Sequence, residues 1–266
     1  MMGKSIGVIS LKGGVGKTSV VASLGSAIAG FNKKVLLVDG NLSAPNLGMH
    51  FKIIDPEKSL HHILDREINA KEAIHTLENV DIIPASIFTD KQVNALKLRD
   101  RMDYLKKKYD FIIYDSSPSL NDETLGVILA SDSLFVVATP DHPTLSVTIK
   151  AINSAKAREI PIDGLIINKV HNKKFEIPLE HVEETLEVPV IAVIPYDLKI
   201  LDALSKFVPS IEHSPKSEAS EEYKKLAAAL VGEEYKPSRL KSFFRWRDPP
   251  KQDINRLVLY QSVFNN

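Results

Sequence analysis

Residues 12 to 18 read Lys-Gly-Gly-Val-Gly-Lys-Thr and have the composition of a loop that holds phosphate groups. They follow the apolar run at 6–10 and precede a helical pattern, so the order is strand, glycine loop and helix. Glycines let the backbone turn its N–H groups inward, while Lys17 can reach the terminal phosphates and the Thr18 hydroxyl can ligate Mg²⁺. The sequence therefore predicts a nucleotide phosphate site, with the positive end of the helix beside it.

Two other apolar runs end in a carboxylate that could serve this loop. Residues 35–38 lead into Asp39, and Asn41 lies on the same face because side chains alternate along a strand. Residues 111–114 lead into Asp115, and an acid at the end of a parallel strand beside a phosphate loop is seldom only structural. Asn41 can hydrogen-bond a water but cannot accept its proton, and its type also fits an ordinary turn.

The elements that must position these residues are short apolar runs alternating with amphipathic helical stretches. We predict strands at 6–10, 35–38, 80–84, 111–114, 134–138, 165–167 and 190–194, and helices at 18–29, 92–108, 145–158, 180–186 and 220–230. This alternation predicts an α/β fold, a mostly parallel twisted sheet with helices on both faces. Ligands of such sheets bind beyond the carboxyl ends of the strands, where the phosphate loop falls.

Composition narrows the class of protein. The chain has 266 residues and is 44% hydrophobic, as expected of a globular protein with a substantial core. Its 34 Lys and Arg balance 34 Asp and Glu, so any attraction to nucleic acid or lipid must be local. The absence of cysteine excludes thiolate catalysis and iron–sulfur ligation. The N-terminus has no signal-peptide pattern, which predicts a cytoplasmic protein.

The phosphate loop departs from the general pattern G-x-x-x-x-G-K-[ST], because Leu11 stands at the first glycine position and Lys12 is an additional lysine. With the double glycine, Lys12 resembles the deviant Walker A motif of the MinD/ParA family, although its type alone also fits an exposed loop lysine. The resemblance implies a P-loop NTPase fold, ATP or ADP with Mg²⁺ as cofactors, and a homodimer with ATP between the subunits. It also implies catalytic roles for Lys17 and for Lys12, which would contact the partner's nucleotide.

The acidic positions follow the same resemblance with one departure. By resemblance, Asp39 supports the magnesium shell together with Thr18 and Asp115, and the family pattern Asp-x-Asp places a second carboxylate at position 41. This chain has Asn41 there. Phosphoryl transfer depends mostly on positioning and charge stabilisation, so we predict an ATPase with slow hydrolysis or none. Asn41, which we place among the catalytic residues, is expected to favour a long-lived ATP-bound dimer.

Two later segments resemble the base-recognition elements of the family. Asn168 is expected to hydrogen-bond the adenine edge, because an amide both donates and accepts, although without the family context it also fits a turn. Residues 195–197 are expected to frame the ring, largely through backbone groups. The predicted ATP-binding residues are Lys12, Gly13, Gly14, Val15, Gly16, Lys17, Thr18, Ser19, Asn168, Pro195, Tyr196 and Asp197.

The resemblance covers residues 3–232 and is nearer to MinD than to plasmid ParA. It predicts an ATPase domain at 1–235 and a C-terminal extension at 236–266. Residues 239–247 combine basic and aromatic side chains, which suits a membrane interface, with docking to a protein partner or packing on the domain as alternatives. Residues 257–264, near the C-terminus, fit a strand, a docking peptide or a second apolar contact.

Three functional classes follow. The favoured one is a MinD-type dimerising switch that positions cell-division or other machinery at the inner face of the cell membrane. The alternatives are a ParA-like DNA-partitioning ATPase, which would use basic residues within 97–108, and an ATP-bound recruitment scaffold without hydrolysis. Acidic residues interrupt that basic stretch, so a solvated helix face is favoured over a nucleic-acid site.

Overall fold

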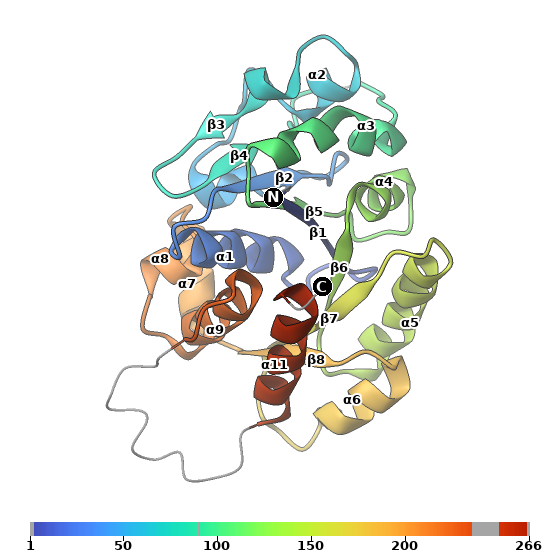
Figure 1. Cartoon of the computed structure of the whole chain (residues 1–266), viewed down its shortest axis with the longest axis vertical. Helices are drawn as coiled ribbons and strands as arrows, with labels where there is room; N and C mark the ends of the chain where they lie inside the picture. The colour runs from blue at the N-terminus through green and yellow to red at the C-terminus, as the bar shows by residue number, and fades with distance from the viewer. Residues whose placement is uncertain (1–2, 90, 236–249, 265–266) are drawn as a thin grey trace.

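In the computed structural model, which describes residues 3–89, 91–235 and 250–264, the centre is an eight-stranded sheet (Figure 1). The strand order is β3-β4-β2-β5-β1-β6-β7-β8, and every neighbouring pair is parallel except β3 with β4. The strands are β1 Lys4–Ile9, β2 Val35–Asp39, β3 His75–Thr76, β4 Asp81–Ile83, β5 Phe111–Asp115, β6 Ser133–Ala138, β7 Ile162–Val170 and β8 Val190–Pro195. Because β1 lies between β5 and β6, the phosphate loop leaves the sheet at its middle.

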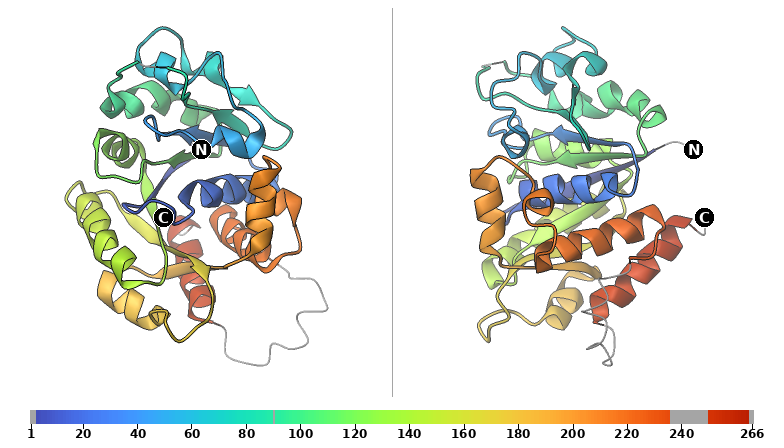
Figure 2. Two further views of the ribbon diagram at one scale, coloured as in Figure 1. Left: turned by 180° about the vertical axis from the view of Figure 1, so that it is seen from behind. Right: turned by 90° about the vertical axis from the view of Figure 1, so that its left-hand side faces the viewer.

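Helices cover both faces of the sheet (Figures 1 and 2). Helices α1, α8, α9 and α11 bury apolar side chains in one core, and α2 to α6 bury theirs in a second core. The helices are α1 Lys17–Ala29, α2 Leu60–Leu64, α3 Leu98–Met102, α4 Asp122–Ala130, α5 His142–Lys156, α6 Leu179–Leu186, α7 Leu198–Ser205, α8 Ser210–His213, α9 Glu218–Val231 and α11 Lys251–Phe264. Short 3₁₀ turns are η1 Gly48–Phe51, η2 Ala70–Ala73, η3 Ala95–Lys97 and η4 Asp103–Lys107.

The central strands are buried on both sides. β2 reads Val-Leu-Leu-Val-Asp, and all five side chains are buried. Alternate residues enter different cores, Val35 with that of α1 and Leu36 with that of α2 to α6, as strand geometry requires. Asp39 pairs in register with Asp115, and Asp115 pairs with Val8. The topology therefore brings the carboxyl ends of β1, β2 and β5 together.

The sequence predictions of regular structure are largely confirmed. All seven predicted strands are present as β1, β2, β4, β5, β6, β7 and β8, and four predicted helices correspond to α1, α5, α6 and α9. The continuous helix predicted over 92–108 is wrong, since three short pieces, η3, α3 and η4, occupy this stretch. The Asn94 side chain accepts the Leu96 N–H and caps η3, so helical structure begins at Ala95 and not at residue 92. Near the end of the stretch, the Lys106 carbonyl accepts the Gly3 N–H. These bonds compete with a continuous helical ladder.

Helix α11 covers the edge of the sheet at β8. The Asn255 amide donates to the Val190 carbonyl at 2.8 Å, and the Arg256 guanidinium donates to the Ile191 carbonyl at 2.9 Å. Leu259 is 5% exposed and belongs to the same core as α1. An edge strand otherwise offers unpaired backbone groups to other chains, so α11 protects this edge.

Part of the predicted C-terminal extension thus packs on the domain as a helix, and a strand at 257–264 is wrong. Residues 236–249, which contain the basic and aromatic segment at 239–247, lie outside the described residues. The boundary at 235 stays a prediction. Among the helices of the described ranges, none is long and apolar enough to cross a membrane.

Candidate functional site

The phosphate loop runs from the end of β1 to the first turn of α1. Gly14 and Gly16 have φ angles of 78° and 89°, in the left-handed region that residues with a Cβ rarely adopt. Gly16 is also the N-cap of α1, so free N–H groups and the positive end of the helix open onto the loop. This backbone conformation is a concavity suited to anions.

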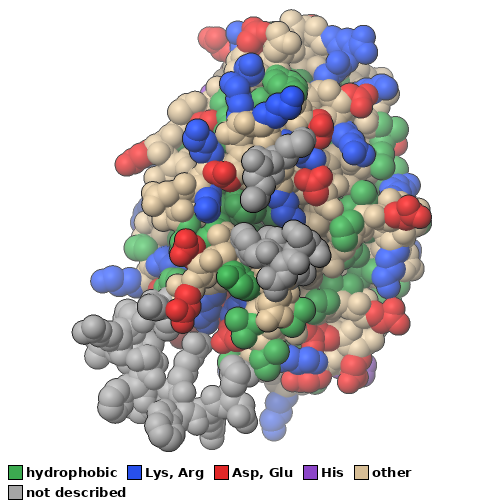
Figure 3. All heavy atoms as spheres, in the orientation of Figure 1, with side chains coloured by type: hydrophobic (Ala, Val, Ile, Leu, Met, Phe, Trp, Pro, Cys, Tyr) green, Lys and Arg blue, Asp and Glu red, His purple; other side chains and the backbone are tan. Residues whose placement is uncertain are grey.

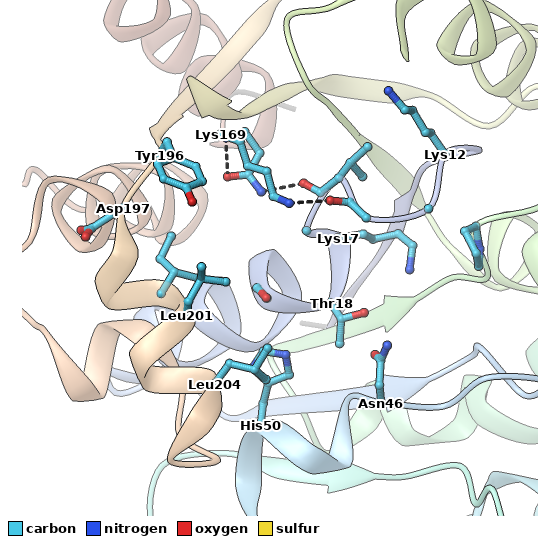
Figure 4. Close-up of a pocket in the computed structure, with 18 of the residues that line it drawn as sticks. Lys12, Lys17, Thr18, Asn46, His50, Lys169, Tyr196, Asp197, Leu201 and Leu204 are labelled. Carbon is cyan, nitrogen blue, oxygen red and sulfur yellow. Dashed lines mark hydrogen bonds between the residues drawn. The ribbon is translucent and has the colours of Figure 1, made fainter. Parts of the chain in front are cut away.

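The loop forms one wall of a pocket of about 560 Å³ (Figure 4). Every predicted ATP-binding residue lines this pocket, and so does Asn41. The volume is ordinary for a small-ligand site. The other lining residues were not among the predicted site residues, and they are Asn46, Met49, His50, Pro118, Lys169, Ile200, Leu201, Leu204 and Tyr223. Residues 46–50 belong to the loop 41–50, whose resemblance to the first switch of the family implies that it senses the γ phosphate, and Pro118 and Lys169 follow the predicted acid Asp115 and Asn168 in the sequence. Those of α7 and α9 have no local motif that could have identified them.

Lys17 and Thr18 both contact Asp115 at the floor of the site. Lys17 Nζ donates to Asp115 Oδ1 at 2.6 Å, and Thr18 Oγ1 donates to Oδ2 at 2.6 Å. Asp115 is fully buried and Lys17 is 7% exposed. Asp39 lies beside them, and its burial, followed by the charge of Asp115, raises the pKa of Asp39 to about 7. A further cation near these carboxylates would be favourable.

The predicted magnesium ligands come together at this point. Thr18, Asp39 and Asp115 supply one hydroxyl and two carboxylates, and Mg²⁺ prefers oxygen ligands. In the described parts of the chain, no group of three or more His, Cys, Asp or Glu could hold a metal. Mg²⁺ commonly uses one or two carboxylates and keeps water and substrate phosphates as further ligands. The donor set therefore fits an ion held jointly with nucleotide phosphates.

Asp39 also organises the loop that follows β2. Its carboxylate accepts N–H groups from Asn41 at 3.2 Å, Asn46 at 3.1 Å and Leu47 at 2.9 Å. These bonds fold residues 41–47 around the acid. The loop and the predicted magnesium site therefore share one carboxylate, so a change at Asp39 reaches both.

The contacts of Asn41 are compatible with both sequence interpretations, a turn residue and a residue that hydrogen-bonds a water in the site. Its side-chain nitrogen donates to the Ala44 carbonyl, which closes a turn. Its Oδ1 is buried and has no hydrogen-bond partner among the described residues. Asn41 also lines the pocket, so this oxygen is available to a water or ligand there.

Lys12 points away from the other phosphate-loop groups (Figure 4). Its Nζ donates to Asp141 Oδ1 at 3.0 Å and to Thr144 Oγ1 at 2.6 Å, at the N-terminus of α5. Burial opposes ionisation of Asp141, but hydrogen bonds from Thr139, Thr144 and Lys12 lower its pKa to about 2. The Lys12 ammonium therefore has an anionic partner outside the phosphate cradle.

The ends of β7 and β8 form the side of the pocket where adenine is predicted to bind. Asn168 Nδ2 donates to the Val15 carbonyl at 2.7 Å, and its Oδ1 accepts the Lys169 N–H at 2.9 Å. The amide is thus engaged with the protein, and its contact with adenine stays a prediction. Tyr196, which lines the pocket, stacks on His171 with ring centroids 4.5 Å apart.

Pro195 and Asp197 border Tyr196 in the same pocket. The Asp197 carboxylate accepts the Lys199 N–H at 2.9 Å and caps α7. The Asp197 carboxylate is therefore engaged with α7, and the contact of residues 195–197 with adenine stays a prediction. Helix α7 then places Leu201 and Leu204 along the pocket wall.

His50 lies at the opposite side of the pocket from Tyr196, in the turn η1 (Figure 4). Its side chain is 6% exposed. Burial lowers the pKa of His50 to about 4, although the charge of Asp115 acts in the other direction. The imidazole is therefore neutral at physiological pH and can act there as a hydrogen-bonding group without a charge.

Comparison with known families gives two matches. Residues 3–161 match the family described as the AAA domain. Residues 91–242 match the 4Fe-4S iron sulfur cluster binding proteins of the NifH/frxC family. Since this chain has no cysteine, it lacks the thiolates that hold such a cluster, and the second match concerns the fold.

Individual relatives are similar over most of their length. An uncharacterized ATP-binding protein of Methanocaldococcus jannaschii is 32% identical over 88% of this chain and 90% of its own. The crystal structure of the Pyrococcus furiosus cell division ATPase MinD has 32% identity and a TM-score of 0.81, covering 85% of this chain and 97% of its own. The septum site-determining protein MinD of Pyrococcus horikoshii, complexed with Mg-ADP, has 29% identity and a TM-score of 0.82, covering 91% and 98%.

We predict that His50 makes the nucleotide-free protein less stable as the pH falls. Its pKa is about 4 when folded and 6.5 in the unfolded reference, so the unfolded chain binds more protons between these values. The stabilising contribution is complete above pH 6.5 and is lost as the pH falls toward 4, about 2 kcal/mol of it by pH 5. Urea unfolding at pH 7 and pH 5 measures this loss, which should be smaller by that amount in His50→Gln.

The matched control is His181→Gln, at an exposed position on α6. The interpretation is wrong if His50→Gln keeps the pH dependence of the wild type, or if both variants reduce it equally.

Proposed function

The chain belongs to the MinD/ParA family of P-loop ATPases, and we propose that it is an ATP-dependent dimerising switch. In this proposal ATP binding assembles a homodimer, the dimer engages the cell membrane or a partner protein, and slow hydrolysis releases it. The observation that carries the proposal is the pair of lysines in one phosphate loop. Lys17 contacts Asp115 at the floor of the site, whereas Lys12, at the border of the pocket, is bound to Asp141.

Adenine nucleotide and Mg²⁺ are the cofactors of this site. The pocket volume, the glycine loop and the buried oxygens of Asp39 and Asp115 fit a nucleotide with its magnesium. When bound, Mg²⁺ offsets the charge of these carboxylates and of the phosphates. Lys17 is expected to turn from Asp115 to the terminal phosphates, and Thr18 is expected to ligate the ion.

A second subunit gives Lys12 a role that its own pocket does not require. The Lys12 side chain is 38% exposed and its ammonium is bound to Asp141, so an incoming phosphate can compete for this ammonium without uncovering a buried charge. A nucleotide presented by another subunit at this face would supply that phosphate. We therefore assign Lys12 to the nucleotide of the partner subunit.

We predict that Lys12→Ala binds ATP within about threefold of the wild type, a change of about 0.7 kcal/mol, but no longer dimerises. Lys17→Ala should lose both properties, because it removes the cation inside the cradle. Calorimetry measures ATP binding, and light scattering in ATP with Mg²⁺ measures whether the 29.5 kDa chain doubles its mass. An ATP-dependent dimer of Lys12→Ala would contradict the sandwich arrangement.

Hydrolysis is proposed to be slow because no carboxylate stands at position 41. Asn41 lines the pocket, and its unpartnered Oδ1 can hold a water without accepting its proton. Asp39 is committed to the backbone of residues 41–47 and to the predicted magnesium site. The ATP-bound state should therefore be long-lived.

We predict that Asn41→Asp raises ATP turnover by about tenfold or more, since it supplies the missing base beside the attacking water. Phosphate release at saturating ATP measures the rate. The matched control is Asn79→Asp, which makes the same change at an exposed position between β3 and β4, outside the pocket, and should leave the rate unchanged. Equal turnover of Asn41→Asp and the wild type, with ATP bound by both, would show that position 41 does not limit hydrolysis. No turnover by the wild type would favour the recruitment scaffold.

DNA partitioning has little structural support. Lys106 is buried and pairs with Asp103 at 3.1 Å and with Asp132 at 2.7 Å. Lys97 pairs with Asp100 at 3.5 Å, so two cations of the stretch 97–108 are already neutralised. On the face seen in Figure 3, basic and acidic side chains are interspersed. Non-specific DNA binding needs an uncompensated basic surface.

We propose that the C-terminal segment 239–247 brings the ATP-bound dimer to the inner face of the cell membrane. Its basic and aromatic composition suits a lipid interface. One such segment binds only marginally, and a dimer doubles it. A truncation is a poor test, because removing α11 would uncover the β8 edge.

We predict that the full chain sediments with anionic liposomes in ATP but not in ADP. Replacing Phe243, Phe244 and Trp246 with Ala should reduce the bound fraction at least fivefold, since it removes most of the apolar contact. The matched control replaces Leu257 and Val258, which are 63% and 60% exposed on α11, and should bind as the wild type does. Absence of sedimentation in ATP would redirect the proposal to a protein partner.

A further inference from the structure

We propose that Lys169 is a positioning residue of the phosphate loop. Together with Asn168, it fixes the orientation of two consecutive peptide units, so that the N–H groups of Val15 and Gly16 face the phosphates before any nucleotide binds. The inference rests on nucleotide binding in this pocket and not on dimerisation or hydrolysis.

Two side chains at the end of β7 donate hydrogen bonds to backbone carbonyl groups of the phosphate loop. Lys169 Nζ donates to the Gly14 carbonyl at 2.6 Å, and Asn168 Nδ2 donates to the Val15 carbonyl at 2.7 Å. Figure 4 shows both bonds reaching the loop from the end of β7. Two adjacent carbonyl groups of the phosphate loop are thus held by two adjacent residues of one strand.

Fixing a carbonyl fixes the N–H group of the same peptide. A peptide unit is planar and trans, so its C=O and N–H point in opposite directions. When the Gly14 carbonyl turns toward Lys169, the N–H of Val15 must turn away from it, and the Val15 carbonyl sets the N–H of Gly16 in the same way. Glycines on both sides of Val15 leave these peptides free to rotate without such bonds.

The end of β7 has an irregular conformation that makes both contacts possible. Consecutive residues of a regular strand point to opposite faces, so Asn168 and Lys169 should not reach the same loop. The pairing of β7 with β8 is irregular between Ile167 and Val170, and Lys169 has a left-handed φ of 59°. Such a conformation costs free energy for a residue with a Cβ and is found where surrounding contacts repay it. Here it turns the lysine toward the phosphate loop.

Gly16 completes the arrangement by its lack of a side chain. A Cβ at Gly16 would lie 2.4 Å from Asn168 Nδ2, so only glycine lets the amide approach this closely. The loop is therefore held from behind by β7, with its carbonyl groups on that side. Its N–H groups are left for the anion on the other side, as in a backbone anion nest.

Variants distinguish a positioning role of Lys169 from a simple attraction between its charge and the phosphates. A charged donor on a carbonyl is stronger than a neutral one, so its loss should weaken ATP binding by about tenfold. Lys169→Arg keeps a charged donor and should restore most of the affinity. Lys174→Met removes a charge from an exposed position in the loop after β7, and should bind ATP as the wild type does.

The test uses the full chain and two measurements. Calorimetry with Mg-ATP compares the wild type with Lys169→Met, Lys169→Arg and Lys174→Met. Heteronuclear NMR of the nucleotide-free proteins compares the amide resonances of Val15 and Gly16. We expect Lys169→Met to shift these two resonances, to bind ATP about tenfold more weakly and to unfold at an unchanged temperature, while Lys169→Arg resembles the wild type.

Two results would overturn the inference. One is unchanged Val15 and Gly16 resonances in Lys169→Met. The other is an equal loss of affinity in Lys174→Met, which would assign the effect to charge alone. If the wild type itself did not bind ATP, the proposed function would fail, whereas the resonances of the nucleotide-free protein would still decide the role of Lys169.

Discussion

The arrangement of the site depends on one constraint, the burial of two carboxylates on adjacent strands. Asp39 and Asp115 pair in register between β2 and β5, and both are fully buried. Bringing a charge out of water is costly unless it is paired and hydrogen-bonded. Lys17 and Thr18 satisfy Asp115, while backbone N–H groups satisfy Asp39. These hydrogen bonds do not fully offset the burial of Asp39 and the nearby charge of Asp115, and the pKa of Asp39 is therefore raised.

This constraint links the phosphate loop to the loop after β2. Asp115 fixes the start of α1 through Thr18, and Asp39 folds residues 41–47 around its carboxylate. A magnesium ion and phosphates entering the pocket would change the partners of both acids. The same carboxylates hold both loops and line up beside the phosphate loop, so the proposed nucleotide site and the loop after β2 share their hydrogen-bonding groups.

Two outer parts of the molecule contact elements that border the pocket. Lys12 lies at the border of the pocket and α5, where its ion pair is half-exposed and can be exchanged. At the other side, α11 covers β8, the strand whose end leads into Tyr196 and the base side of the pocket. Helix α11 is thus anchored to the strand whose end frames the site.

The sequence by itself determined the α/β fold, seven of the strands, the phosphate loop and the acids at the ends of β2 and β5. These features depend on local hydrophobic runs, on glycine conformation and on the alternation of strands with helices, which short stretches of sequence carry. Only the tertiary structure decided that Lys12 pairs with Asp141, that Asn168 and Lys169 hold the phosphate loop, and that α11 covers β8. Each of these contacts joins segments far apart in the chain, or depends on an irregular strand end, and no local pattern encodes such a meeting.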